Sequence, residues 1–231
     1  FLLAEGVIIE ASQIQRVCYC EDVDREDQRY NVVTVDLTAD APADGDLAPL
    51  ERHFTTTSAC GVCGKASLEA LEVRGCQPVA PGPQVDLSTI YSLPDRLSKA
   101  QKVFRSTGGL HAAALFDAQG TLLALREDVG RHNALDKLIG WALLGGRAAE
   151  LAQGVVLVSG RASYELAQKC ATAGIPILCA VSAPSSLAVD VARRFGLTLI
   201  GFLRGERCNV YTGAERIATT PGHRLSDGDS I

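Results

Sequence analysis

Three short apolar runs, separated by two amphipathic stretches, constrain the fold of this chain more than any other feature of its sequence. The apolar runs cover residues 155–159, 177–181 and 197–203, and the stretches between them, 163–173 and 185–195, place apolar residues at helical spacing. Strands that are apolar on both faces are typical of sheets covered by helices, and strand–helix–strand repeats favour parallel neighbours. We therefore predict an α/β fold with a mixed, partly parallel sheet flanked by helices.

Upstream patterns predict further strands and helices. Apolar and polar residues alternate on both sides of a charged turn at 24–28, and again on both sides of 117–120, as they do in β-hairpins. Pro94 stands at a position that suits the first turn of a helix, which we expect to run to about residue 105. Apolar spacing predicts another helix over 133–144.

A proline-rich stretch at 79–87 predicts a linker between two lobes. We expect residues 1–84 to form a smaller β-rich lobe that carries the first hairpin and a loop with a CxxC motif. Residues 85–217 are expected to form the α/β core that binds a ligand. Residues 218–231, rich in Thr, Gly, Asp and Ser, are expected to be a tail without an assigned role.

Charge and composition exclude several classes of protein. The chain holds 22 Lys and Arg against 27 Asp and Glu, a net charge of −5, which argues against a general nucleic-acid binder. No apolar run is long enough to span a membrane, and no signal peptide opens the chain. The eight cysteines are too sparse for the disulfide framework of a small secreted protein, so we expect a cytoplasmic protein. Because the chain begins at Phe1 inside an apolar stretch and holds no Met, we expect a piece of a longer protein with methionine positions dropped.

Small and polar residues follow three predicted strands, at the edge where α/β sheets bind ligands. Hydroxyls, helix N-terminal N–H groups and arginines at this edge suit a phosphate-bearing ligand. No GxxxxGK[ST] motif occurs, so the site is not a P-loop. Ser163 and Ser185 could instead be simple helix caps. The candidate residues are Ser159, Gly160, Arg161, Ser182, Ala183, Ser185, Arg204, Gly205, Glu206 and Arg207.

Two motifs bracket the second hairpin and bring histidines and acids to strand ends. They are Thr-Gly-Gly-Leu-His at 107–111 and Glu-Asp-Val-Gly-Arg-His-Asn at 127–133. Such groups could act as acids and bases, hold a metal or line a binding site. In the alternative interpretation, His132 or Asn133 caps a helix while Asp128 pairs with Arg131. The candidate residues are Gly109, His111, Asp128 and His132.

The CxxC motif formed by Cys60 and Cys63 has three interpretations. It could be half of a zinc site, although the spacing to Cys76 or His53 matches no standard finger. It could be a thioredoxin-like dithiol, although it lies outside the regular α/β region. It could also carry a nucleophilic thiolate on a loop, where flanking glycines permit movement and Lys65 with a nearby helix N-terminus lowers the thiol pKa.

Four strings together resemble the FdhD family, the sulfurtransferase accessory proteins of formate dehydrogenase, over residues 1 to about 217. They are Phe-Thr-Thr-Thr-Ser-Ala-Cys-Gly-Val-Cys-Gly-Lys at 54–65, the string at 107–111, Glu-Asp-Val-Gly-Arg-His-Asn-Ala-Leu-Asp-Lys at 127–137, and Ser-Ala-Pro-Ser-Ser-Leu-Ala-Val at 182–189 with the downstream strings 201–204 and 209–212. The resemblance implies a core like that of cytidine deaminase and a homodimer.

The resemblance also implies a function. Members accept persulfide sulfur from a cysteine desulfurase and pass it to the bis-guanine-dinucleotide molybdenum or tungsten cofactor for the catalytic subunit of formate dehydrogenase. Cys60 would then be the persulfide-carrying residue and Cys63 its partner. Guanine nucleotides would bind at the site of the cofactor. The cofactor-contacting segment would be Phe202, Leu203, Arg204, Gly205, Glu206 and Arg207.

Two rival functions differ in chemistry. A deaminase-type hydrolase would need the H-x-E and P-C-x-x-C zinc signature, and no histidine here has Glu two residues on, while Ala59 precedes the first cysteine of the motif. A cofactor-binding chaperone without chemistry of its own would use the CxxC motif for structure or for zinc. A free thiol that accepts sulfur separates the carrier from the chaperone.

Overall fold

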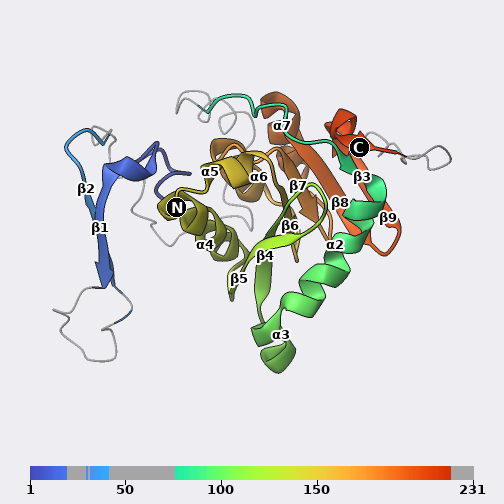
Figure 1. Ribbon diagram of the computed structural model, residues 1–231, viewed down its shortest axis with the longest axis horizontal. Helices are drawn as coiled ribbons and strands as arrows, with labels where there is room; N and C mark the ends of the chain where they lie inside the picture. The colour runs from blue at the N-terminus through green and yellow to red at the C-terminus, as the bar shows by residue number, and fades with distance from the viewer. Residues whose placement is uncertain (20–29, 31, 42–75, 220–231) are drawn as a thin grey trace. The chain divides into compact units, whose positions relative to one another are not determined.

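A computed structural model describes residues 1–19, 30, 32–41 and 76–219 (Figure 1). The chain divides into two compact units, residues 1–55 and 56–231. In the first unit, η1 (Ala11–Gln13) precedes β1 (Ile14–Tyr19), which pairs antiparallel with β2 (Val33–Leu37). The first predicted hairpin is therefore confirmed for the described residues on both of its strands.

The second unit is built on a six-stranded mixed sheet in the order β5-β4-β6-β7-β8-β9. Its centre, β6 to β8, is parallel, whereas β4 and β5 on one side and β9 on the other run antiparallel to their neighbours. The predicted mixed, partly parallel sheet is confirmed. The strands are β4 (His111–Phe116), β5 (Leu122–Asp128), β6 (Val155–Val158), β7 (Ile177–Ala180), β8 (Thr198–Arg204) and β9 (Arg207–Thr212).

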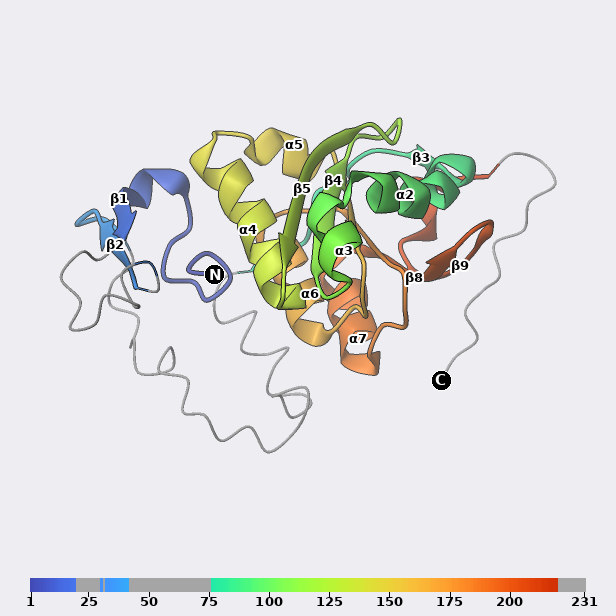
Figure 2. The same ribbon diagram turned by 90° about the horizontal axis from the view of Figure 1, so that it is seen from below.

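Helices cover both faces of this sheet (Figures 1 and 2). On one face lie α4 (Arg131–Leu144), α6 (Tyr164–Thr172) and α7 (Ser186–Phe195), with α5 (Ala148–Ala152) against α4. On the other face lies α2 (Leu87–Ala100). Because strand side chains alternate between faces, each central strand contributes side chains to two buried layers, one on each face of the sheet. The layer under α2 includes Ala112, Ala114, Phe116, Val155, Leu157, Ile177, Cys179 and Ile200.

The helix predicted to begin at Pro94 begins one to two turns earlier, at Leu87, so that prediction is wrong. A proline inside a helix removes one backbone hydrogen bond and costs about 3 kcal/mol. Here the cost is offset because Leu87, Ile90, Leu93 and Leu97 are spaced to form one stripe, which is fully buried against the sheet. A separate helix, α3 (Lys102–Thr107), follows after extended Gln101.

The stretch expected as a linker packs against the second unit. Residues 79–84 have no regular structure, but the Val79 N–H donates to the Phe195 carbonyl over 2.8 Å. They lead into β3 (Val85–Asp86), which pairs in parallel with β10 (Ile217–Ala218). The short helix η4 (Ala214–Arg216) directly precedes β10 in the chain. Among the described residues, no helix is both long and apolar enough to cross a membrane.

Candidate functional site

Backbone hydrogen bonds bring the predicted strand-end segments into one row. The Ser159 N–H donates to the Ala112 carbonyl over 3.0 Å, the Ser182 N–H to the Gly160 carbonyl over 3.3 Å, and the Phe202 N–H to the Ser182 carbonyl over 3.1 Å. The ends of β4, β6, β7 and β8 therefore meet at the carboxyl edge of the parallel strands. This is the edge at which α/β sheets bind their ligands.

Three helices begin at this carboxyl edge, and two serines predicted as simple caps behave differently there. The Ser185 hydroxyl accepts from the Ala188 N–H over 3.2 Å and caps α7, as the alternative interpretation predicted. Ser163 is the N-cap residue of α6, but its hydroxyl makes no cap hydrogen bond. It lies 3.1 Å from His132 Nε2 instead. The N-termini of α4 and α6 are thus joined through side chains.

His132 also contacts a carboxylate that the sequence did not single out. Its Nε2 atom lies 2.9 Å from Glu165 Oε2, and both side chains are about one-third exposed. Because one nitrogen meets both the Ser163 hydroxyl and the Glu165 carboxylate, the arrangement is not a relay in which the second ring nitrogen orients the base. His132 is therefore positioned at the rim of the edge, linking α4 to α6.

Asp128 serves as a structural centre for the turn between β5 and α4. Its Oδ1 accepts from the Gly130 N–H over 2.8 Å and from Asn133 Nδ2 over 3.2 Å, and its Oδ2 lies 2.5 Å from Lys137 Nζ. Burial alone would raise the pKa of Asp128, but the hydrogen bonds and the Lys137 charge lower it below its ordinary value. The ion pair thus goes to Lys137 and not to Arg131. Because α4 begins at residue 131, neither His132 nor Asn133 caps it.

Glu127, beside Asp128, holds the neighbouring helix. Its carboxylate accepts from the Val103 N–H over 3.2 Å and from the Phe104 N–H over 2.9 Å, at the start of α3. These N–H groups have no partner within the helix, so the carboxylate supplies their acceptor. Its negative charge also interacts favourably with the positive end of the helix dipole. In the part of the chain that the structure describes, no group of three or more His, Cys, Asp or Glu could hold a metal ion. The acids of the motif at 127–137 therefore hold the starts of α3 and α4 in place.

We expect Asp128→Asn to lower the free energy of unfolding by about 2 kcal/mol at pH 7, because charge-assisted hydrogen bonds are lost from a side chain that is only 13% exposed. A carboxyl whose pKa is lowered by folding stabilises the protein above its unfolded pKa, and this contribution is lost as the pH falls through the folded pKa. The difference between wild type and variant in urea denaturation should therefore shrink below about pH 4.

The matched control for this prediction is Asp95→Asn, because Asp95 is an exposed acid on α2. This variant should unfold with the wild type at every pH. A gap between wild type and Asp128→Asn that stays constant from pH 7 to pH 3 would contradict the role assigned to the Asp128 charge.

The turn between β8 and β9 presents the predicted cofactor-contacting segment. Phe202 has a φ of 53°, which is rare for a bulky residue, and its side chain is 45% exposed. The register of β8 and β9 shifts between Gly201 and Arg204, and Gly205 completes the turn with a φ of 53°. Leu203 is buried. Backbone strain of this kind is found at functional sites more often than elsewhere.

Positive charge surrounds this turn. The side chains of Arg204 and Arg207 are exposed on it, together with Glu206, and Arg204 Nε donates to the Val181 carbonyl over 3.2 Å. Arg161 is exposed beyond the end of β6. Exposed guanidinium groups around a row of strand ends are suited to phosphate oxygens.

Gly160 allows a close approach of a side chain to the backbone at the centre of the row. A Cβ at this position would lie 3.4 Å from His111 Nδ1, so the imidazole of His111 lies against the glycine. Gly109, predicted to belong to the site, is exposed in the turn that connects α3 to β4. Ala183 is half-buried, and its carbonyl accepts from the Ala162 N–H over 3.2 Å.

Arg131 is a residue that the sequence analysis considered only as a partner for Asp128. It is the first residue of α4, and its Nε atom is buried without a hydrogen-bond partner among the described residues. A buried guanidinium N–H without a partner is costly unless something supplies an acceptor. An anionic ligand at the carboxyl edge would supply such an acceptor. In the sequence, the feature that could have pointed to Arg131 is an arginine at the predicted start of a helix, directly after the polar end of a strand.

The two cysteines of the CxxC motif, Cys60 and Cys63, lie outside the described residues. Of the described cysteines, Cys170 and Cys179 are fully buried and free. Burial raises the pKa of both thiols far above its ordinary value. Neither buried thiol is therefore suited to act as a nucleophile.

Comparison with known proteins identifies the family. The model of the FdhD/NarQ family matches residues 1–218. A protein of Streptomyces avermitilis named sulfur carrier protein FdhD is 55% identical over 221 residues, and the match covers 94% of this chain and 77% of that protein. A protein of the same name from Mycobacterium tuberculosis is 52% identical over 223 residues, and the match covers 94% of this chain and 79% of that protein. The crystal structure of a Desulfotalea psychrophila protein, provisionally assigned as a formate dehydrogenase accessory protein, matches with a TM-score of 0.69 and 29% identity, covering 94% of this chain and 76% of that one. This chain therefore belongs to the FdhD/NarQ family.

Proposed function

We propose that this protein is a sulfur carrier that takes up persulfide sulfur on Cys60, with Cys63 as its partner, and transfers it to a molybdenum or tungsten cofactor with guanine dinucleotide arms. The observation that carries the proposal is the combination of the CxxC motif with family relatives named sulfur carrier protein FdhD. In this proposal the donor is a cysteine desulfurase in the cytoplasm, and the loaded cofactor serves the catalytic subunit of formate dehydrogenase. The protein acts as a homodimer with a core like that of cytidine deaminase.

Sulfur uptake at Cys60 conserves atoms and electrons. The Cys60 thiolate attacks the outer sulfur of the donor's persulfide and forms a new S–S bond. The S–S bond of the donor breaks, and the donor leaves as a thiolate. An accessible thiol with a lowered pKa is required for this step, and the basic Lys65 beside the motif favours the thiolate. The buried Cys170 and Cys179 lack both properties.

The residues of the carboxyl edge fit a substrate with pyrophosphate groups. Exposed Arg161, Arg204 and Arg207 supply guanidinium groups, and the buried Nε atom of Arg131 has no acceptor among the residues that the structure describes. The imidazole of His111 lies against Gly160 at the centre of the row, and guanine nucleotides would use the same strand-end groups. Phe202 projects an exposed aromatic ring beside these cations, which suits stacking on a planar base.

Intact mass spectrometry after incubation with a cysteine desulfurase and cysteine tests the proposal. We expect a reductant-sensitive gain of one sulfur, about 32 Da, on the peptide that contains Cys60 and Cys63. The peptides containing Cys170 and Cys179 are internal controls and should show no gain, because these thiols are buried. No gain anywhere, with zinc bound at the CxxC peptide, would refute the carrier and favour the cofactor-binding chaperone.

A further inference from the structure

Gln101, between α2 and α3, is a buried glutamine with an unpaired side-chain amide. Only 6% of the residue is exposed, and its Nε2 atom is enclosed without a hydrogen-bond partner among the described residues. Of the polar residues that are buried in the described part of the chain, it is the one with such an atom. An enclosed N–H group without an acceptor is costly, so its presence here needs an explanation.

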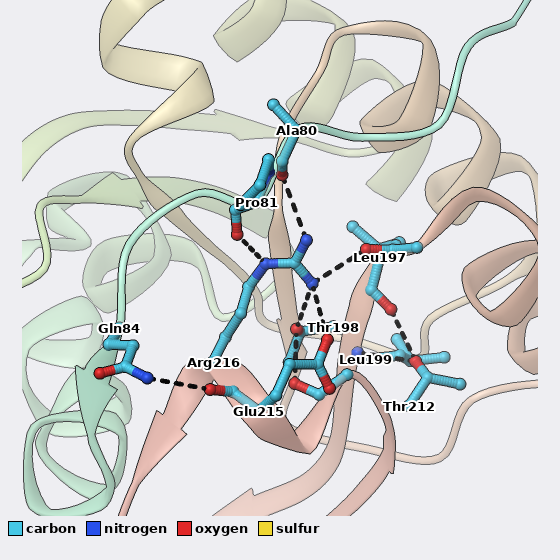
Figure 3. A network of polar contacts seen from close by, with 11 residues as sticks. Ala80, Pro81, Gln84, Leu197, Thr198, Leu199, Thr212, Glu215 and Arg216 are labelled. Carbon is cyan, nitrogen blue, oxygen red and sulfur yellow. Dashed lines mark hydrogen bonds and ion pairs between the residues drawn. The ribbon is translucent and has the colours of Figure 1, made fainter.

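Arg216, a buried arginine of the same unit, shows how such donors are satisfied elsewhere (Figure 3). It is 7% exposed, and its Nη2 donates to the Ala80 carbonyl over 3.1 Å while its Nε donates to the Pro81 carbonyl. Its Nη1 donates to the Gly196 carbonyl over 2.9 Å. Backbone carbonyls thus meet all three nitrogens of this guanidinium, whereas Gln101 Nε2 meets no acceptor among the residues that the structure describes.

A carboxylate from the sheet leaves the Gln101 amide uncommitted. Gln101 is the N-cap residue of α3, a position from which polar side chains often accept from an N–H two or three residues on. It makes no such bond, and Glu127 at the end of β5 holds the Val103 and Phe104 N–H groups instead, over 3.2 and 2.9 Å. The amide of Gln101 is therefore available to another group.

An exposed aromatic ring and two cations lie on the helix that begins at this amide. Phe104 is 41% exposed and is the third residue of α3, which neighbours the N-cap residue in the first turn. Lys102 and Arg105 are exposed, and no residue of α3 is buried. The helix can therefore shift without loss of core packing, which opens the enclosed amide to a ligand. A ring that stacks, an amide that pairs and cations that meet phosphates are the groups that bind nucleotides.

The sheet places these groups at one end of the row of strand ends. Glu127 pairs with Ala112 across β5 and β4, and the Ala112 N–H donates to the Ser159 hydroxyl over 2.9 Å. Phe202, the exposed ring at the other end of the row, belongs to β8, which is four strands from β5 in the sheet. Four spacings between strands amount to about 19 Å. One ring system cannot contact both ends, so the amide marks a second position.

We propose that Gln101 and Phe104 form a second ring-binding position at the carboxyl edge, for the lactam edge of a guanine or of a pterin. The inference rests on the proposed function, because each arm of that ligand joins a guanine to a pterin through a pyrophosphate. A lactam presents an N–H beside a carbonyl. Gln101 Nε2 donates to the lactam oxygen, and Gln101 Oε1 accepts from the lactam N–H. The ring stacks on Phe104, while Phe202 meets the ring at the other end of the arm.

Calorimetry with GDP and with GDP methylated on O6 tests the lactam contact. The methyl group removes the pairing of N–H with carbonyl and leaves the phosphates unchanged. If guanine binds here, wild type should bind GDP about tenfold more tightly than the methylated probe, and Gln101→Met should bind the two equally. Gln119→Met is the matched control, because Gln119 is exposed in the turn between β4 and β5, at the opposite edge of the sheet. This control should keep the tenfold preference.

A pterin probe, 6-hydroxymethylpterin, distinguishes the two sources of the lactam. If Gln101→Met weakens binding of this probe about tenfold and leaves GDP unchanged, the ring at Gln101 is the pterin. Loss of the preference for GDP with unchanged pterin binding identifies guanine. Unchanged binding of both probes, equal weakening of GDP and methylated GDP, or binding of neither probe to wild type would overturn the inference.

Urea denaturation checks the fold of Gln101→Met, in which an apolar side chain of similar volume replaces the amide. If this variant does not fold, Phe104→Ala decides instead, because the ring is exposed. Its loss should weaken GDP or the pterin about tenfold, and unchanged binding of both would contradict the proposal. Persulfide loading of Cys60 is measured separately. Binding that depends on Gln101 without any loading refutes the proposed function alone, whereas loading without such binding refutes this inference alone.

Discussion

A Cys60→Ala chain is expected to lose the activation of formate dehydrogenase by about 100-fold or more while still binding a guanine nucleotide, because an alanine cannot accept sulfur, whereas the groups proposed to bind the nucleotide belong to the strand ends. Activation is measured by adding the purified variant to formate dehydrogenase made without any carrier. Nucleotide binding is measured in parallel by calorimetry. Separate outcomes for the two assays distinguish a carrier from a protein that only binds the cofactor.

Cys18→Ala provides the control for this experiment. Cys18 is a free, half-buried cysteine on β1 and is not among the residues proposed for the site, so its replacement should leave both activation and nucleotide binding at wild-type levels. If Cys60 and Cys63 could both be replaced without loss of activation, the carrier proposal would fail. In that case the chain would act on its ligand by binding alone.

Replacing Lys169 with methionine is expected to lower the free energy of unfolding by about 3 kcal/mol or more. The Lys169 side chain on α6 is only 5% exposed, and its Nζ atom lies 2.8 Å from Asp136 Oδ1 on α4. Removing one member of a buried pair takes the opposite charge away from the other, which is costly, whereas removing both charges is often nearly neutral. The double variant Lys169→Met with Asp136→Leu should therefore recover most of the loss.

Urea denaturation measures these differences, and a surface pair provides the control. Arg193 and Asp190 on α7 lie 3.6 Å apart with mostly exposed side chains, so Arg193→Met should change stability by less than about 0.5 kcal/mol. A double variant that is as unstable as Lys169→Met would show that the lost charge pair is not the cause. The effect would then belong to packing between α4 and α6.

The sheet could be predicted because its strands are marked by composition. Runs such as 155–158 and 177–180 are apolar on both faces, which in a chain of this size indicates burial between helices. The strand β9 was missed because polar and apolar side chains alternate only from Arg207 to Val210, which is the shortest stretch that indicates a strand. Its place at the edge of the sheet requires burial on part of one face only.

Tertiary contacts decided the features that local rules missed. Pro94 is a good first-turn residue, but the buried stripe of α2 extends in front of it and determines where the helix begins. The Asp128 charge meets Lys137, two turns into α4, rather than the nearer Arg131. Sequence spacing gives the distance along a helix but not the direction in which an arginine leaves its first turn.

The site was predicted as a set of strand ends because parallel strands share one carboxyl edge whatever their exact length. Ser159, Gly160 and Ser182 are accordingly in one hydrogen-bonded row with Phe202. The contacts of Glu165 and Ser163 with His132 were not predictable, because they depend on how close the first turns of α4 and α6 come together. No periodic pattern encodes that separation.

The parallel pairing of β3 with β10 places the beginning and the end of the α/β unit side by side. The chain from residue 85 to residue 218 therefore starts and ends at the same place, where β3 pairs with β10. Whatever precedes residue 85 and whatever follows residue 218 attach at that one junction, far along the chain from each other but neighbours in space. A change in the length of either flanking part therefore does not interrupt the order of the six strands.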